Sequence, residues 1–253
     1  MSVTAVFSSK AEMYAKYRWD YAPQAIQAIL DVTQISNESS IADIGAGTGI
    51  LTKHFVDKVK DVFAIEPNLE MRQMARKELE PYPSCHVIDG CAEATTLPDH
   101  SIDLITVAQA IHWFEPEPTK VEFLRILEPD GWLAVLRNYG TDDELNEAIA
   151  GILIEENGVD TSHAAKLPAR KPMCFFYGND EFLRLTFSFA VQLTWEGFIG
   201  SLSSASYAPD EGSPLYANFE RAARKVFDRF SSDGRLCLQG VTELYLGQIA
   251  TYG

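Results

Sequence analysis

One segment of the chain limits its possible folds more than any other, because an apolar stretch runs directly into three alternating glycines. Residues 41–51 are Ile-Ala-Asp-Ile-Gly-Ala-Gly-Thr-Gly-Ile-Leu, with glycine at positions 45, 47 and 49. Glycine permits positive φ and lets a ligand approach the backbone, and the free N–H groups at the start of a helix attract an anionic or polar group. The segment therefore predicts a strand, a tight turn and a helix, with a ligand held at the turn.

The sequence around this loop predicts a doubly wound α/β fold. Short β-branched or apolar runs alternate with longer helical patterns, which is typical of a parallel sheet whose crossover helices cover both faces. Strands are predicted at Ile41–Ile44, Val62–Ile65, His86–Ile88, Ile102–Val107 and Trp132–Arg137. Helices are predicted to begin near Gly49, Asn68, Glu93 and Glu117.

The flanking regions are expected to complete this core. Residues 1–36 predict an N-terminal helical cap, with helix over Ser8–Val32 interrupted by Pro23, and residues 37–140 form the ligand-binding core. Residues 141–253 are expected to close a seven-stranded, mostly parallel sheet and to form a substrate pocket. Their predicted elements are helices at Asp142–Asn157 and Pro214–Phe230 and strands at Leu183–Leu193 and Arg235–Leu246.

The spacing of the glycines separates two kinds of ligand. A dinucleotide pyrophosphate is held by G-x-G-x-x-G, whereas this loop is G-x-G-x-G, and counting from Gly47 places Thr52 at the third glycine position. The spacing disfavours a nicotinamide-dependent oxidoreductase. A tight turn that binds no ligand is the remaining alternative.

A carboxylate at the end of the second strand is the predicted ribose ligand. Residues 62–68 are Val-Phe-Ala-Ile-Glu-Pro-Asn, which places Glu66 about twenty residues past the loop, beside a bound ribose. Both ribose hydroxyls are donors, and one carboxylate can accept from the two of them. The alternative is that Glu66 only favours the N-terminus of the following helix.

These features together resemble the class I S-adenosylmethionine-dependent methyltransferases over about Tyr14 to Arg137. The resemblance rests on the D-x-G-x-G-x-G form of residues 43–49, on Glu66, and on the Leu-Glu-Pro-Asp-Gly-Trp turn at 127–132. The string Ala-Gln-Ala-Ile-His-Trp-Phe at 108–114 is similar to the subgroup of trans-aconitate methyltransferases and related small-acid methyltransferases. The resemblance implies a Rossmann-like fold that binds S-adenosyl-L-methionine and releases S-adenosyl-L-homocysteine.

The resemblance also implies a set of cofactor-binding residues. The glycine loop would curl around the methionine and ribose with support from Asp43, and an N-terminal tyrosine and arginine would approach the cofactor's carboxylate. Position 91, where the family usually has an acid for the adenine amino group, is Cys91, which leaves the backbone N–H of Ala92 to address a ring nitrogen. The expected residues are Asp43, Gly45, Ala46, Gly47, Gly49, Glu66, Pro67, Met71, Cys91, Ala92, Glu93, Ala108, Gln109, Tyr14 and Arg18.

Methyl transfer from a sulfonium needs little from the protein beyond positioning and the exclusion of water. A carboxylate acceptor requires no base. For a phenol or amine acceptor, His112 is the candidate base, because imidazole titrates near neutral pH; the alternative is that it only forms a wall of the site. The residues expected at the substrate are His112, Trp113, Tyr17 and Trp19, and no metal site is predicted.

Charge and composition indicate which partners and which cellular location to expect. The chain carries 36 acidic against 21 basic residues, a net charge of −15, which would repel a phosphate backbone. Its apolar runs are too short to span a membrane, and it lacks both a C-x-x-C pair and an apolar leader, which favours a reducing cytoplasm. A monomer or homodimer is expected.

The sequence therefore predicts a methyltransferase that acts on a small organic molecule, by O-methylation of a carboxylate or hydroxyl, with N- or C-methylation left open. Two alternatives remain at this point. One is a catalytically silent protein that binds S-adenosylmethionine and acts as a regulator, and the other is the nicotinamide-dependent oxidoreductase already disfavoured by the glycine spacing.

Overall fold

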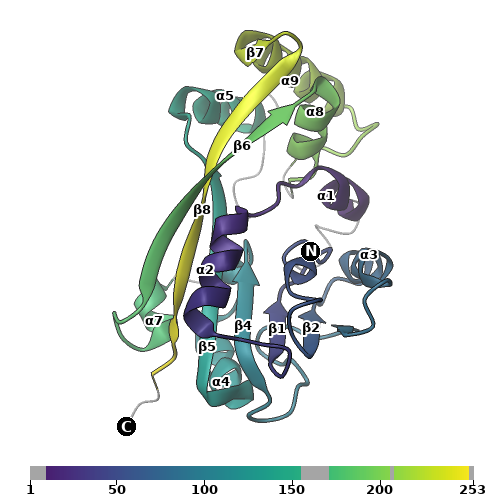
Figure 1. Ribbon diagram of the computed structural model, residues 1–253. Coiled ribbons are helices and arrows are strands. Elements are labelled where there is room, and N and C mark those ends of the chain that lie inside the picture. The colour runs from purple at the N-terminus through teal and green to yellow at the C-terminus, as the bar shows by residue number, and fades with distance from the viewer. Residues whose placement is uncertain (1–9, 155–170, 206–207, 251–253) are drawn as a thin grey trace.

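A single mixed sheet organises the molecule, and the computed structural model describes it over residues 10–154, 171–205 and 208–250. The strand order is β3-β2-β1-β4-β5-β8-β6, with a short β7 paired beside β8 (Figure 1). The first five strands are parallel, and β8 runs antiparallel to both β5 and β6. The bounds are β1 Ser40–Ile44, β2 Asp61–Ile65, β3 Cys85–Ile88, β4 Ile102–Ala108, β5 Leu127–Gly140, β6 Leu183–Leu193, β7 Ser231–Ser232 and β8 Arg235–Gln248.

This architecture confirms the predicted doubly wound fold. The seven predicted strands all form, and the two-residue β7 is added to them. The helices are α1 Ala11–Tyr17, α2 Pro23–Thr33, α3 Leu69–Leu79, α4 Pro116–Ile126, α5 Asp143–Ile154, α7 Met173–Tyr177, α8 Trp195–Ser203 and α9 Tyr216–Phe230, with 3₁₀ turns η3 at Thr52–His54 and η4 at Ile111–Trp113. Asn68 begins α3 as an N-cap, its side chain accepting from the Met71 N–H at 2.9 Å.

Two predicted helices are wrong. After the glycine loop the chain forms only η3, because Gly47 and Gly49 hold positive φ values of 58° and 85° and the turns that follow never reach a regular α-helix. Near Glu93, Cys91 and Ala94 exchange backbone hydrogen bonds in a tight turn, and Thr96 then adopts a φ of 66°. In the first segment the N–H groups of His54 and Phe55 donate to carbonyls three residues earlier, as in a 3₁₀-helix, and in the second the positive φ of Thr96 interrupts helical geometry.

The predicted N-terminal helix is divided where proline begins a new one. Pro23 stands at the first position of α2, where a missing N–H costs nothing, and residues 18–22 separate α2 from α1. α1 contacts α3 and α8, whereas α2 packs against β6 and β8. Residues 8 and 9, and residues 155–157 of the helix expected after Asp142, lie outside the described residues.

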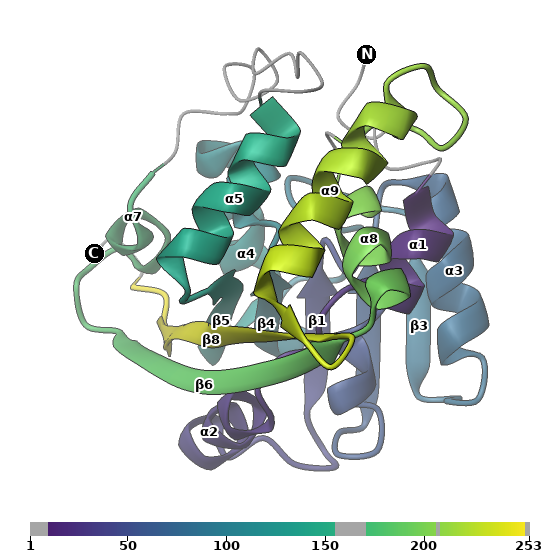
Figure 2. The same cartoon turned by 90° about the horizontal axis from the view of Figure 1, so that it is seen from above.

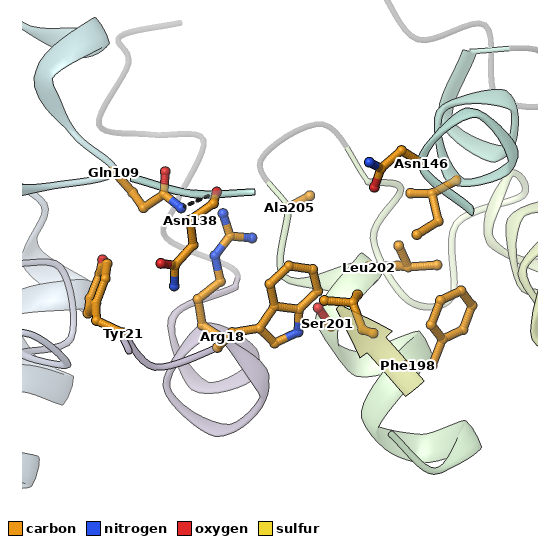
Figure 3. A pocket seen from close by; sticks show the side chains of 12 residues that line it. Arg18, Tyr21, Gln109, Asn138, Asn146, Phe198, Ser201, Leu202 and Ala205 are labelled. Carbon is orange, nitrogen blue, oxygen red and sulfur yellow. Dashed lines mark hydrogen bonds between the residues drawn. The ribbon is translucent and has the colours of Figure 1, made fainter. Parts of the chain in front are cut away.

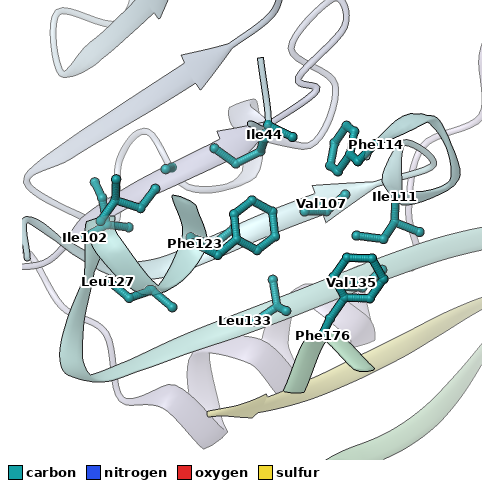
Figure 4. Close-up of a cluster of buried hydrophobic side chains, with 14 of the residues drawn as sticks. Ile44, Ile102, Val107, Ile111, Phe114, Phe123, Leu127, Leu133, Val135 and Phe176 are labelled. Carbon is teal, nitrogen blue, oxygen red and sulfur yellow. The ribbon is translucent and has the colours of Figure 1, made fainter. Parts of the chain in front are cut away.

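Three apolar clusters hold the layers together. On one face of the sheet, Phe123 of α4 and Phe176 of α7 pack over Leu133 and Val135 (Figure 4). The opposite face is covered by α2, α3 and the segment around Phe55. A third cluster joins α5, α8 and α9 to the far ends of β6 and β8, which extend past the parallel strands (Figures 1 and 2).

The order of the strands determines where a ligand can enter. The chain moves from β1 outward to β3, then returns to place β4 on the other side of β1, so the connections diverge between β1 and β4. Ligands bind outside the carboxyl ends of the strands at such a point. The glycine loop follows β1 there, and Gln109 follows β4. Among the described helices, none has the length and apolar character required to cross a bilayer.

Candidate functional site

The glycine loop is joined to the end of the neighbouring strand by backbone donors. The N–H groups of Gly45 and Ala46 both donate to the carbonyl of Ile65, at 2.9 and 3.1 Å. The N–H of Gly47 donates to Oε2 of Glu66 at 2.9 Å. The loop and the predicted ribose ligand therefore form one hydrogen-bonded unit.

The three glycines have different surroundings although all three have positive φ. A Cβ on Gly45 would lie 2.8 Å from the Ala110 Cβ, and one on Gly49 would lie 2.8 Å from the Leu79 side chain. A Cβ on Gly47 would meet nothing closer than the Tyr14 ring at 4.0 Å. Gly45 and Gly49 permit close packing of the protein, whereas Gly47 presents bare backbone to open space.

Glu66 is a buried carboxylate with spare hydrogen-bonding capacity. It is 7% exposed, and its Oε1 accepts from the Asn68 N–H at 2.8 Å while Oε2 accepts from Gly47. Each carboxylate oxygen can accept a second bond, so two donors of a ligand can still be satisfied. Burial raises the pKa of Glu66, opposed by the two backbone hydrogen bonds and by Arg72, whose guanidinium donates to the Glu66 carbonyl at 2.8 Å.

Asp43 lies behind the loop rather than at a cavity wall. It is fully buried at the end of β1 and accepts hydrogen bonds from the hydroxyls of Thr52 at 2.6 Å and Thr106 at 3.0 Å. Burial raises the pKa of Asp43 to about 6, although these hydroxyl donors oppose the rise. Asp43 thus connects β1, β4 and the turn that follows the glycines.

A cavity of about 260 Å³ opens beside Gly47 and Glu66, and we call it the loop cavity. Its walls are mostly apolar, and burial together with the neighbouring Glu93 carboxylate raises the pKa of the Cys91 thiol, which favours its neutral form. Glu93 itself accepts from the Glu115 N–H at 2.8 Å. The lining residues are Tyr14, Gly45, Gly47, Glu66, Pro67, Asn68, Met71, Cys91, Ala92, Glu93, Ala108, Gln109, Ala110, Trp113 and Phe114.

A second cavity, of about 200 Å³, adjoins the first, and we call it the Arg18 cavity (Figure 3). Gln109 lines both cavities. This residue has a φ of 56°, and its side-chain amide donates to the Asn138 carbonyl at 2.9 Å, which fixes it at the end of β4. The Arg18 cavity is lined by Arg18, Trp19, Tyr21, Gln109, Asn138, Asn146, Ile149, Phe198, Ser201, Leu202, Ala205 and Leu238.

The structure brings most of the predicted cofactor residues to the loop cavity. The exceptions are Asp43 and Gly49, which lie behind it, Ala46, which packs partly buried beside the core, and Arg18, which lines the second cavity. Sequence reasoning missed Asn68, Ala110 and Phe114 at this cavity. Their signal was their position inside the segments 66–71 and 108–114, several of whose other members were selected.

The predicted substrate residues are spread over the site. Trp113 lines the loop cavity and Trp19 lines the Arg18 cavity. Tyr17 packs its ring against Gly200 and donates its hydroxyl to Glu196 at 2.6 Å. His112 belongs to η4 with its ring 5.0 Å from that of Trp113, and it is not among the described residues that line the two cavities.

No metal centre competes with this interpretation in the described part of the chain, where no three histidine, cysteine or acidic side chains form a group that could hold an ion. Most of the Arg18 cavity could not be predicted, because its residues come from the segment after α1, from β5, α5, α8 and β8, and from the ends of β4 and α8, and share no motif. Only Arg18, Trp19 and Gln109 had been selected from the sequence.

Comparison with known proteins finds a methyltransferase domain over the same part of the chain. A family model described as a methyltransferase domain matches residues 42–135. An uncharacterized methyltransferase of Schizosaccharomyces pombe is 34% identical over 133 residues, which is 52% of this chain and 52% of that protein. One of Mycobacterium tuberculosis is 37% identical over 138 residues, or 54% and 53% of the two chains. The matched region thus spans about half the length of these curated relatives.

A solved structure extends the likeness of fold to nearly the whole chain. A candidate type II methyltransferase from Anaeromyxobacter dehalogenans superposes with a TM-score of 0.62 at 18% identity, covering 93% of this chain and all of that one. The identity is low, so this match concerns the fold. With the glycine loop and Glu66 at one cavity, the family match identifies residues 42–135 as a methyltransferase domain of the class I S-adenosylmethionine-dependent type.

Proposed function

We propose that this protein transfers the methyl group of S-adenosyl-L-methionine to an oxygen of a small organic acceptor, a carboxylate or a hydroxyl. The observation that carries the proposal is Glu66, a buried carboxylate that faces the Gly47 N–H on the wall of the loop cavity. This cavity opens at the carboxyl edge of the sheet, where the strand order diverges.

The chemistry of the loop cavity fits this cofactor. Glu66 has two acceptor positions left for the ribose hydroxyls, and Gly47 leaves open the space that a side chain would occupy. Met71, Ala92 and Phe114 offer apolar surface to a purine ring, while Cys91 stands where related enzymes usually have an acid. When bound, the cofactor supplies a methyl group that is already activated by a positively charged sulfur.

The side chains around the site would then position the reactants and exclude water, which can supply roughly 7 to 11 kcal/mol of the barrier reduction in well-oriented systems. Gln109 lies between the two cavities and is fixed by its bond to Asn138. Oxygen acceptors differ in what else they need. A carboxylate requires no proton transfer, whereas a hydroxyl requires a base, and His112 remains the predicted one.

The family match does not favour the two alternatives, a catalytically silent regulator that binds S-adenosylmethionine and a nicotinamide-dependent oxidoreductase. Both can be tested by thermal-shift titration with S-adenosylmethionine and with NADH, because a true ligand stabilises the folded state in proportion to its occupancy. Stabilisation by NADH alone would contradict the proposed cofactor. A protein that binds S-adenosylmethionine but labels no compound in pooled small metabolites, when given cofactor with a radioactive methyl group, would fit the regulatory alternative.

The net charge of the chain is consistent with a small molecule as the methyl acceptor. A net charge of −15 disfavours nucleic acid as the substrate and leaves small molecules as the proposed acceptors. A monomer or homodimer and a cytoplasmic location remain predictions from the sequence.

The central test is the change Glu66→Ala. Hydrogen bonds to a charged group contribute about 1.5 to 3 kcal/mol each, so we expect the affinity for S-adenosylhomocysteine to fall at least tenfold. Isothermal titration calorimetry measures this directly. Glu80→Ala is the matched control, because Glu80 is exposed at the end of α3 and lines neither cavity. Unchanged affinity in a folded Glu66→Ala protein would remove Glu66 as the ribose ligand.

A further inference from the structure

We propose that the Arg18 cavity is the acceptor site and that it selects a small monocarboxylate with an apolar body. This inference rests on the proposed function, since it assumes that the cofactor occupies the loop cavity. Among the described residues that line the Arg18 cavity, Arg18 is the only charged one. In a chain with 36 acidic and 21 basic residues, a cavity with a cation and no carboxylate favours an anion.

The guanidinium of Arg18 is available for such a ligand. It lies over the Tyr14 ring, 5.1 Å from the ring centre, and forms no ion pair with a carboxylate of the described residues. Figure 3 shows the side chain reaching from the end of α1 into the cavity beside Asn138. A guanidinium presents two parallel donors that match the two oxygens of a carboxylate.

A second donor in the cavity wall also lacks a partner. The indole N–H of Trp19 is buried and has no hydrogen-bond acceptor among the described residues. A buried donor left unpaired is costly, and an oxygen of a bound ligand would relieve that cost once the Trp19 ring turns, because the nitrogen itself is not exposed to the cavity. The nearby amides each use one N–H in holding the wall and keep a second one: Asn138 donates to the Asp20 carbonyl at 3.0 Å, and Asn146 donates to the Gly140 carbonyl at 2.9 Å.

The rest of the wall determines the body of the acceptor. Ile149, Phe198, Leu202 and Leu238 provide apolar surface, and the volume of about 200 Å³ is below that of pockets for larger ligands. A second carboxylate on the acceptor would be desolvated against these residues without a cation to pair with. The cavity therefore favours one negative charge, unlike the tricarboxylate of the enzymes that the sequence resembles.

The position of Arg18 indicates which atom is methylated. Arg18 contacts Tyr14, which lines the loop cavity, so it marks the side where the two cavities meet, as Gln109 does. A carboxylate held there would form the new oxygen–carbon bond as the carbon–sulfur bond breaks, with the electron pair left on sulfur and no proton released. The ester product carries no charge and loses its ion pair with Arg18, which favours its release.

The experiment uses the whole protein saturated with S-adenosylhomocysteine. Ligand-observed NMR would measure binding of hexanoate and phenylacetate at up to about 10 mM, enough to detect a Kd near 1 mM. The comparison compounds are phenylacetamide, phenethylamine and trans-aconitate, which are neutral, cationic and triply acidic. We expect the two monocarboxylates to bind at least tenfold more tightly than the others, and Arg18→Gln to abolish that preference while changing the affinity for S-adenosylhomocysteine less than twofold. Arg221→Gln, on the exposed side of α9, is the matched control and should behave as the wild type.

The outcomes separate this inference from the proposed function. If the wild-type protein does not bind S-adenosylhomocysteine, the proposed function fails. If it does, but neither monocarboxylate binds or the amide or trans-aconitate binds as well, the monocarboxylate site is wrong. If Arg18→Gln weakens the cofactor and leaves carboxylate binding unchanged, Arg18 belongs to the cofactor and the inference is overturned. Melting temperatures of both variants verify that they are folded.

Discussion

The glycines of the loop have different roles: some permit close packing within the protein, and one leaves space for a ligand. Gly45 allows the loop to lie against Ala110, so its lack of a side chain serves packing. Gly47 lines the loop cavity, and a Cβ built on it would meet nothing closer than the Tyr14 ring at 4.0 Å. The motif that looks uniform in the sequence is therefore two structural glycines around one that leaves room for a ligand.

The variants Gly45→Ala and Gly47→Ala test whether the two glycines have these different roles. Both variants incur the strain of a left-handed alanine, roughly 1 to 2 kcal/mol, but only Gly45→Ala also drives its methyl into the fixed Cβ of Ala110. We expect urea denaturation to show the larger loss of unfolding free energy for Gly45→Ala. Gly47→Ala should instead show the larger loss of S-adenosylhomocysteine affinity among the molecules that remain folded. Equal stability of the two variants would contradict this assignment.

Asp43 makes the fold sensitive to pH. Its pKa is about 6 in the folded protein because of burial, against about 3.9 in an unfolded chain. Below about pH 4 both states hold the proton. As the pH rises, the unfolded chain releases the proton first, so this group lowers the stability of the fold until the pH passes the folded pKa.

The change Asp43→Asn removes this titration and keeps the shape of the side chain. We expect the unfolding free energy of the variant, minus that of the wild type, to increase by about 2 kcal/mol between pH 4 and pH 7 and then level off. Urea denaturation at a series of pH values measures the difference, which cancels the titration of the other groups. Parallel curves would show that Asp43 keeps an ordinary pKa in the folded protein.

Among the elements, α1 and α8 pack on each other, and this contact positions the segment after α1 that forms part of the wall of the Arg18 cavity. Tyr17 lies so close to α8 that a Cβ on Gly200 would be 2.5 Å from its ring. The Tyr17 hydroxyl and Lys16 both donate to Glu196, which holds α1 to the first turn of α8. The contact places Arg18 and Trp19, immediately after α1, opposite Phe198 and Leu202 of α8.

The two glycines of α8 provide a matched test of this packing. Gly197→Ala would meet nothing closer than 3.5 Å, so it should stabilise the helix by up to about 1 kcal/mol. Gly200→Ala must displace the Tyr17 ring, and we expect a loss of about 1 to 3 kcal/mol. Thermal or urea unfolding of the two variants measures the contrast. A Gly200→Ala protein as stable as Gly197→Ala would show that α1 does not depend on close contact with α8.

Across the whole molecule, the two cavities lie at the carboxyl edge of a sheet that is closed by segments distant in sequence. The loop cavity is built almost entirely from residues 45–114, which form the β1 to β4 half of the sheet, with Tyr14 added from α1. The Arg18 cavity needs β5, α5, α8 and β8 as well. The loop cavity is therefore formed mostly by residues close together in the sequence, whereas the Arg18 cavity requires elements from the whole chain to pack together.

The sequence by itself determined the α/β alternation, the glycine loop and Glu66, because each depends on residues close together in the chain and on backbone chemistry. It misjudged the segments after Gly49 and near Glu93, where local hydrogen bonds and positive φ values override helical patterns. Only the tertiary structure showed that Asp43 is buried and accepts hydrogen bonds from neighbouring elements, and that Arg18 lines a different cavity from Tyr14. The physical reason is that burial and side-chain direction depend on which distant elements pack together, and no local pattern encodes that.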